Sequence, residues 1–152
     1  MIAILTVLFA FELTRLALKI KIPGLRSYEM SRPAAYAMGG LAIGIGLLFF
    51  HMPLTIVAVC GMAWIDPLCR ITRRTKYYPA LPLVSYFILA AIVFFFAEYS
   101  LGIVIVLAVV GSIVAIASEF PNLKFIDDDF VMILAPLVVM GGLELLFSSF
   151  LP

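Results

Sequence analysis

The chain has 152 residues, of which 65% are hydrophobic and 12% charged, and its mean hydropathy is +1.22. A soluble domain of this size carries about 45–50% apolar and about 25% charged residues, so the composition excludes a soluble fold. Six membrane crossings of about 20 residues each leave no length for a separate nucleotide-binding domain. The 10 Lys and Arg nearly balance the 9 Asp and Glu, which argues against a nucleic-acid partner. We therefore expect an all-α, polytopic transmembrane helical bundle, with residues 1–152 forming a single transmembrane domain.

The first three apolar stretches occupy the N-terminal half of the chain. The first runs from Ile2 to about Ile20, and because its basic residues follow the apolar run, we expect a retained membrane helix and not a signal peptide. The second spans Ala34 to Phe50, and the third begins at Leu54 and reads LTIVAVCGMAWIDPLCR. His51, Met52 and Pro53 make a very short turn between these two stretches.

The third helix is predicted to be broken or kinked at Asp66-Pro67. The segment Pro53–Ile65 has 13 residues, which gives about 20 Å of helix, less than a hydrocarbon core of about 30 Å. Proline disfavours helical dihedral angles in the residue before it, and Asp-Pro suits the N-cap and first position of a new helix. Irregular backbone inside a bilayer is tolerated only against protein or a water-filled cavity. A break would therefore place a polar pocket at Asp66.

Three more apolar stretches follow a basic loop. The fourth spans about Leu81 to Ala97 and the fifth Leu101 to Ala117, and their short connection makes them antiparallel neighbours. The sixth runs from Phe130 to about Phe150. We leave Glu144, inside the sixth stretch, out of any site. We also expect His51 to be a turn residue, because a single His without a second His or Cys nearby is weak evidence for a metal.

The charged residues are predicted to gather on one membrane face. All ten basic residues fall in or beside the three connections that six crossings place on the same side, and the positive-inside rule makes that side cytoplasmic, with both termini outside. Seven of the nine acidic residues are predicted to lie on the same side as the basic residues. Carboxylates together with Arg and Lys at the mouth of a helix bundle are suited to holding Mg²⁺ and a polyphosphate.

Two segments carry a resemblance to a known family. Trp64–Cys69 is similar to a Gly-Asp-x-x-Ala segment, with Ile65 in place of the glycine. Ala115–Glu119 followed by Ile126–Asp129 resembles a Glu, spacer, Asp-Asp-Asn ending before a last helix, with aspartate in place of the final Asn. The chain thereby resembles, over roughly Glu12 to Pro136, the membrane-embedded superfamily that contains dolichol kinase, phytol kinase and phosphatidate cytidylyltransferase. The family's Gly-Lys and Lys-Ser/Thr elements are absent.

This resemblance implies an enzyme that uses CTP and Mg²⁺ at the cytoplasmic face to transfer a phosphoryl or a cytidylyl group to a membrane lipid. It implies that Asp66 and Asp128 are catalytic. The metal-binding carboxylates that it implies are Asp66, Glu119, Asp127 and Asp128. The side chains that it implies for binding the nucleotide phosphates are Arg70, Arg73, Arg74 and Lys76.

Two classes of function remain open from the sequence. The first is a transferase that phosphorylates a polyprenol-type alcohol or forms a CDP-lipid, as a monomer or a homo-oligomer. The second is a non-catalytic membrane protein, such as a transporter subunit or assembly factor, because a broken helix is also a transporter trait. The absence of an internal repeat and the one-sided charges argue against a transporter. The Asp-Gly-x-x-Ala-Arg series of CDP-alcohol phosphotransferases is absent.

Overall fold

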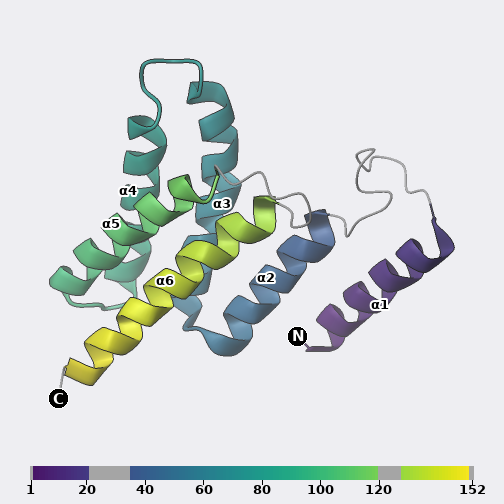
Figure 1. Cartoon of the computed structure of the whole chain (residues 1–152). Helices are drawn as coiled ribbons and strands as arrows, with labels where there is room; N and C mark the ends of the chain where they lie inside the picture. Colours follow the sequence, from purple (N-terminus) through teal and green to yellow (C-terminus); the bar gives the residue numbers. More distant parts are fainter. Residues whose placement is uncertain (1, 21–34, 120–127, 151–152) are drawn as a thin grey trace.

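The computed structural model describes residues 2–20, 35–119 and 128–150, which form helices and no strands. The all-α prediction is thus confirmed over this part of the chain, and each predicted apolar stretch contains one helix (Figure 1). The helices are α1 (Ile2–Leu18), α2 (Ala35–Phe49), α3 (Met52–Thr72), α4 (Ala80–Phe96), α5 (Leu101–Ala117) and α6 (Asp128–Phe150).

The predicted break at Asp66-Pro67 is wrong, because α3 runs without interruption through both residues. Pro67 removes one backbone hydrogen bond, the one that its missing N–H would have donated to Ala63, and transmembrane helices tolerate such a loss when neighbouring helices support them. Asp66 does not cap a new helix; its carboxylate pairs with Arg70, one turn further along α3. The 21 residues of α3 extend over about 31 Å. A kink without a break remains a prediction.

Helix α3 lies at the centre of the bundle and packs against α2, α4, α5 and α6. The chain reverses between α4 and α5 at Glu98, whose φ of 62° is left-handed. The N–H of Tyr99 bonds the carbonyl of Phe94 and that of Glu98 bonds the carbonyl of Phe95, which is the Schellman ending of a helix. The two helices are therefore antiparallel neighbours, as predicted. Helix α1 lies at the edge of the molecule beside α2 (Figure 1).

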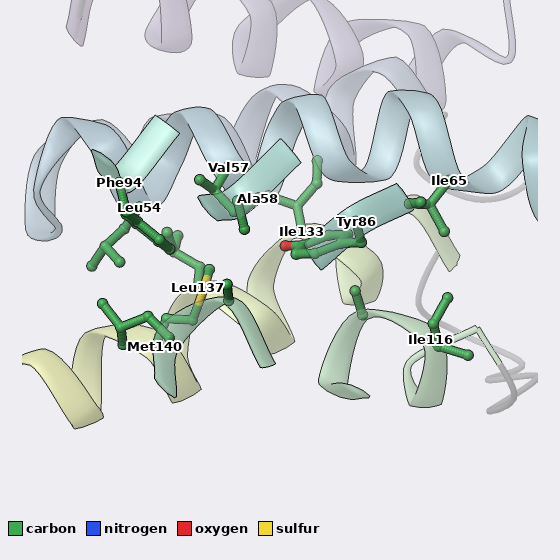
Figure 2. Close-up of a cluster of buried hydrophobic side chains, with 14 of the residues drawn as sticks. Leu54, Val57, Ala58, Ile65, Tyr86, Phe94, Ile116, Ile133, Leu137 and Met140 are labelled. Carbon is green, nitrogen blue, oxygen red and sulfur yellow. The ribbon is translucent and has the colours of Figure 1, made fainter. Parts of the chain in front are cut away.

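Tyr86 of α4 is completely buried in the middle of the bundle, within the hydrophobic core. A Cβ at Gly61 of α3 would lie 2.2 Å from the Tyr86 ring, and one at Gly111 of α5 would lie 3.5 Å from it and 2.6 Å from the sulfur of Met140. Side-chain-free positions on two helices therefore make room for one aromatic ring from α4. Figure 2 shows this ring among the apolar side chains of α3 and α6.

Within the described residues, two helical segments are long and apolar enough to cross a membrane. These are α3, with 21 residues, and Phe130–Ser148 of α6, with 19 residues. Three further apolar helical segments, Ala37–Phe49, Ala80–Phe96 and Leu101–Ala117, are shorter. Two such segments give weak support to a membrane protein, and they leave the number of crossings open.

Replacing Gly61 by Ala should lower stability, because the added methyl group would collide with the buried Tyr86 ring. Overpacking of this kind costs about 1–3 kcal/mol, and we expect a loss of about 2 kcal/mol in the free energy of unfolding. Gly102→Ala is the matched control, since nothing lies within 4 Å of its added Cβ. Thermal unfolding in detergent, followed by circular dichroism, measures both. Equal stability of the two variants would contradict the packing of Tyr86 described here.

Candidate functional site

The candidate site is built around Glu119, which follows the end of α5. Its side chain is 6% exposed, and its Oε1 accepts a hydrogen bond of 2.6 Å from Nη2 of Arg73. Its Oε2 accepts a second bond, of 3.2 Å, from the hydroxyl of Tyr78. A buried carboxylate is costly unless it is paired and hydrogen-bonded. Both oxygens of Glu119 meet that requirement with groups from the connection between α3 and α4.

The local sequence explains why Arg73 and Tyr78 reach the same carboxylate. Arg73 caps the C-terminus of α3, and the hydroxyl of Thr75 bonds the carbonyl of Thr72 and accepts a bond from the N–H of Tyr77. These bonds fold the connection back toward α5 before α4 begins at Ala80.

The two partners of Glu119 respond to its charge. The hydrogen bond and the negative charge of Glu119 raise the pKa of the Arg73 guanidinium. Burial, followed by the charge of Glu119, raises the pKa of the Tyr78 hydroxyl. Arg73 therefore stays cationic and Tyr78 stays a hydrogen-bond donor throughout the neutral pH range, so the pair and the bond persist together.

A second ion pair lies on the same end of α3. Nη2 of Arg70 is 3.1 Å from Oδ2 of Asp66, with the arginine side chain 62% exposed and the aspartate 24% exposed. Cys69, which directly precedes Arg70 in α3, is fully buried. The structure thus brings together Asp66, Arg70, Arg73 and Glu119, all of which the sequence proposed as site residues.

The other two basic residues of the predicted phosphate-binding set, Arg74 and Lys76, are not paired with a described carboxylate as Arg70 and Arg73 are. Arg74 and Lys76 are exposed, and within the described part of the chain neither forms an ion pair with an acidic side chain. The ammonium group of Lys76 lies 5.4 Å from the centre of the Tyr77 ring. The structure therefore separates the four cations into two that are paired with carboxylates and two that face outward.

The predicted metal-binding set is only partly described. Asp127 lies outside the described residues. Asp128 begins α6, but its side chain is also outside them. Figure 1 shows the start of α6 at the same end of the bundle as the end of α5. Among the residues that are described, no three His, Cys, Asp or Glu side chains gather to hold a metal ion.

Sequence reasoning missed Cys69 and Tyr78 at this end, and a second polar cluster at the other end. There, Oε1 of Glu144 accepts a bond of 2.9 Å from Nδ1 of His51 and another from the hydroxyl of Tyr99. Burial, followed by Glu144, raises the pKa of Tyr99. The available signal was Glu144 itself, because an acidic side chain inside an apolar helix needs a partner.

No family model, curated protein or solved structure matches this chain.

Removing the cation beside Glu119 should destabilise the protein, because a nearly buried carboxylate would keep only Tyr78. We expect Arg73→Gln to lower the free energy of unfolding by about 1–2 kcal/mol, less than the 3–5 kcal/mol typical of fully buried pairs, since Arg73 is 57% exposed. Arg74→Gln is the matched control and should change it by less than about 0.5 kcal/mol. A double-mutant cycle with Glu119→Gln in zwitterionic detergent isolates the coupling, and a coupling of zero would contradict the pair.

At the other end, Tyr99 should matter more than His51. Tyr99 is partly buried and bonds a carboxylate, whereas the His51 side chain is 74% exposed. Hydrogen bonds to charged groups contribute about 1.5–3 kcal/mol, but exposed ion pairs contribute at most about 1 kcal/mol. Tyr99→Phe should therefore lower the unfolding free energy at least twice as much as His51→Asn. The reverse order in thermal unfolding would show that Glu144 depends on His51.

Proposed function

We propose that this chain is a polytopic membrane transferase that uses CTP and Mg²⁺ at its cytoplasmic face to phosphorylate a polyprenol-type alcohol or to form a CDP-lipid. The observation that supports it best is the pairing of Asp66 with Arg70 and of Glu119 with Arg73 at one end of the helices. Carboxylates and guanidinium groups at one mouth are the combination that polyphosphate transfer requires. The resemblance to the dolichol kinase superfamily is the reason for proposing CTP as the nucleotide and a membrane lipid as the acceptor.

The spacing of the two polar clusters supports more than two crossings. Along α3, His51 and Arg73 are separated by the 21 helical residues, or about 33 Å from one Cα to the other. Along α5, Tyr99 and Glu119 are 20 positions apart, about 30 Å. Both spans match a hydrocarbon core of about 30 Å. Helix α5 alone has 17 residues, so its flanking polar residues complete the crossing.

The outer faces of the shorter helices also suit lipid. Ile88, Ile92 and Phe96 of α4 are 51%, 52% and 80% exposed, and Ile105 and Ile113 of α5 are 48% and 53% exposed. Apolar faces of this extent are uncommon on soluble monomers. The positive-inside rule then assigns the end with Arg70, Arg73 and the rest of the basic loop to the cytoplasm, with both termini outside.

The side chains of the site are chemically suited to Mg²⁺ bound through a nucleotide. Mg²⁺ prefers oxygen ligands and usually takes only one or two carboxylates, with phosphates and water completing its shell. Asp66 keeps accepting capacity beyond the one oxygen that bonds Arg70, and Glu119 lies on the neighbouring helix end. Asp66 and Asp128 would hold the metal, together with Asp127 and Glu119. The metal would neutralise charge that develops on the transferred phosphate.

The protein's own side chains would orient the lipid hydroxyl and neutralise the negative charge of the phosphates. Arg70 and Arg73 would exchange part of their bonding to carboxylates for bonds to phosphate oxygens, which match the planar guanidinium equally well. A carboxylate beside the lipid hydroxyl would orient it or accept its proton. Tyr78 would hold Glu119 in place when Arg73 turns to a phosphate, because it bonds the other oxygen of the same carboxylate.

The proposal is tested by incubating the purified protein with Mg²⁺, a membrane lipid extract supplemented with polyprenol, and CTP labelled either in its γ-phosphate or in its cytidine. We expect a labelled lipid, and the labelled part of CTP that it carries identifies phosphoryl or cytidylyl transfer. Asp66→Asn should lower the rate at least about 100-fold, as expected for a group that acts mainly on the transition state.

Glu98→Gln is the matched control, because it removes an exposed carboxylate at the opposite end of the bundle and should leave the rate unchanged. An absence of labelled lipid with CTP, ATP or GTP, from protein of intact helical content, would contradict the transferase. The non-catalytic alternative, a transporter subunit or assembly factor, would then hold.

A further inference from the structure

One face of α3 is exposed along its length and continues into the basic loop. Cys60, Trp64 and Ile71 follow one another at spacings of four and seven residues, which places them on the same side of α3, and Arg74 follows in the connection after the helix ends at Thr72. Trp64 is 64% exposed and Ile71 is 73% exposed, and Cys60 and Arg74 are exposed as well. This exposed side of α3 is therefore apolar from Cys60 to Pro67, the exposed Arg70 stands beside Ile71 near its end, and the connection beyond it is cationic.

The length of the helix sets the depth of these residues in a bilayer. From Met52 to Ile71 the rise is about 29 Å at 1.5 Å per residue, close to the hydrocarbon thickness of about 30 Å. If Met52 lies at one boundary, Ile71 lies at the other. Arg74 and Lys76 follow directly and reach the layer of lipid headgroups, and Trp64 lies about 10 Å below Ile71, against the acyl chains.

Two cations at the end of this face form no ion pair within the described residues. Arg70 and Arg73 are paired with Asp66 and Glu119, but Arg74 and Lys76 are exposed and form no ion pair within the described residues. Tyr77, which is 58% exposed and lies beneath the Lys76 ammonium, adds an aromatic ring suited to the interface. Figure 1 shows the connection between α3 and α4 projecting beyond the neighbouring ends of α2 and α6.

We propose that Arg74 and Lys76, with the exposed face of α3 below them, form a binding surface for an anionic phospholipid of the cytoplasmic leaflet. The phosphate of the headgroup meets the two cations, and the acyl chains lie along Ile71 and Trp64. The occupant is an anionic lipid because Arg74 and Lys76, which form no ion pair within the described residues, stand at the headgroup depth of a largely apolar side of α3. This inference rests on the membrane location proposed above and does not depend on transferase activity.

Trp64 is the only tryptophan in the chain and is a built-in reporter of the lipid beside α3. The full chain is reconstituted into phosphatidylcholine vesicles that contain phosphatidylglycerol, with bromine on the acyl chains of one or the other lipid at equal mole fraction. Bromine quenches a tryptophan that it touches. We expect phosphatidylglycerol to be enriched about fivefold at Trp64 in low salt and less in high salt.

The double variant Arg74→Gln/Lys76→Gln should abolish this enrichment, whereas Lys19→Gln, which removes an exposed cation from the end of α1, should retain it. Trp64→Phe gives the background fluorescence. Equal quenching by both lipids in the unaltered protein, or enrichment that survives in the double variant, would overturn the proposal. So would an absence of quenching by either lipid, because α3 would then not face the acyl chains.

A further measurement distinguishes binding of a lipid headgroup from binding of a nucleotide phosphate. The sequence resemblance implies that Arg74 and Lys76 bind nucleotide phosphates. Saturating CTP with Mg²⁺ should leave the lipid enrichment at Trp64 in place. Loss of enrichment under CTP would assign Arg74 and Lys76 to the nucleotide and overturn the lipid surface. Because the other arms contain no nucleotide, an inactive protein could still show lipid enrichment, and the two proposals fail separately.

Discussion

The cost of placing a charge among apolar helices governs where polar residues stand in this molecule. Glu119 is nearly buried, and it is stable there because Arg73 and Tyr78 satisfy its two oxygens. Glu144 meets the same requirement with His51 and Tyr99. In each case the tyrosine and the base come from connections, so a carboxylate at or near a helix end is tied to turns far away in the sequence. The polar clusters therefore fix how the helix ends meet.

Between the clusters, small residues determine how closely the helices approach. The Tyr86 ring packs against Gly61 of α3 and Gly111 of α5, neither of which has a side chain in its way. The helices α3, α4 and α5 can therefore pack around one buried aromatic group. Packing by shape replaces the hydrophobic effect where the surroundings are themselves apolar. The pair between Glu119 and Arg73 depends on this packing, because it brings the end of α5 to the end of α3, whereas the pair between Asp66 and Arg70 forms within α3 itself.

The helices were predictable because long apolar runs separated by Pro, Gly and charged residues leave few alternatives. The bounds of α5 follow the run from Leu101 to Ala117 without change. Pro67 misled the prediction, because local propensity favours a break and the packing of four helices around α3 outweighs it. Four of the predicted site residues form two ion pairs, and this pairing could not be predicted from the sequence. Which arginine meets Glu119 depends on the fold of the loop after α3, and Tyr78 carries no mark in the sequence that distinguishes it from Tyr77.

The distribution of unpaired charge finally distinguishes the two ends. At the end with Glu144, the described charges form one cluster, and Glu98 remains as an exposed acid. Around the end of α3, the acids Asp66 and Glu119 are both paired, and Arg74 and Lys76 remain as exposed cations without an ion pair in the described part of the chain. Neutralising these carboxylates thus uses Arg70 and Arg73, two of the four cations between Arg70 and Lys76. If the molecule lies in a membrane as proposed, Arg74 and Lys76 are the charges on which the positive-inside rule would act, and the paired arginines would contribute little to it.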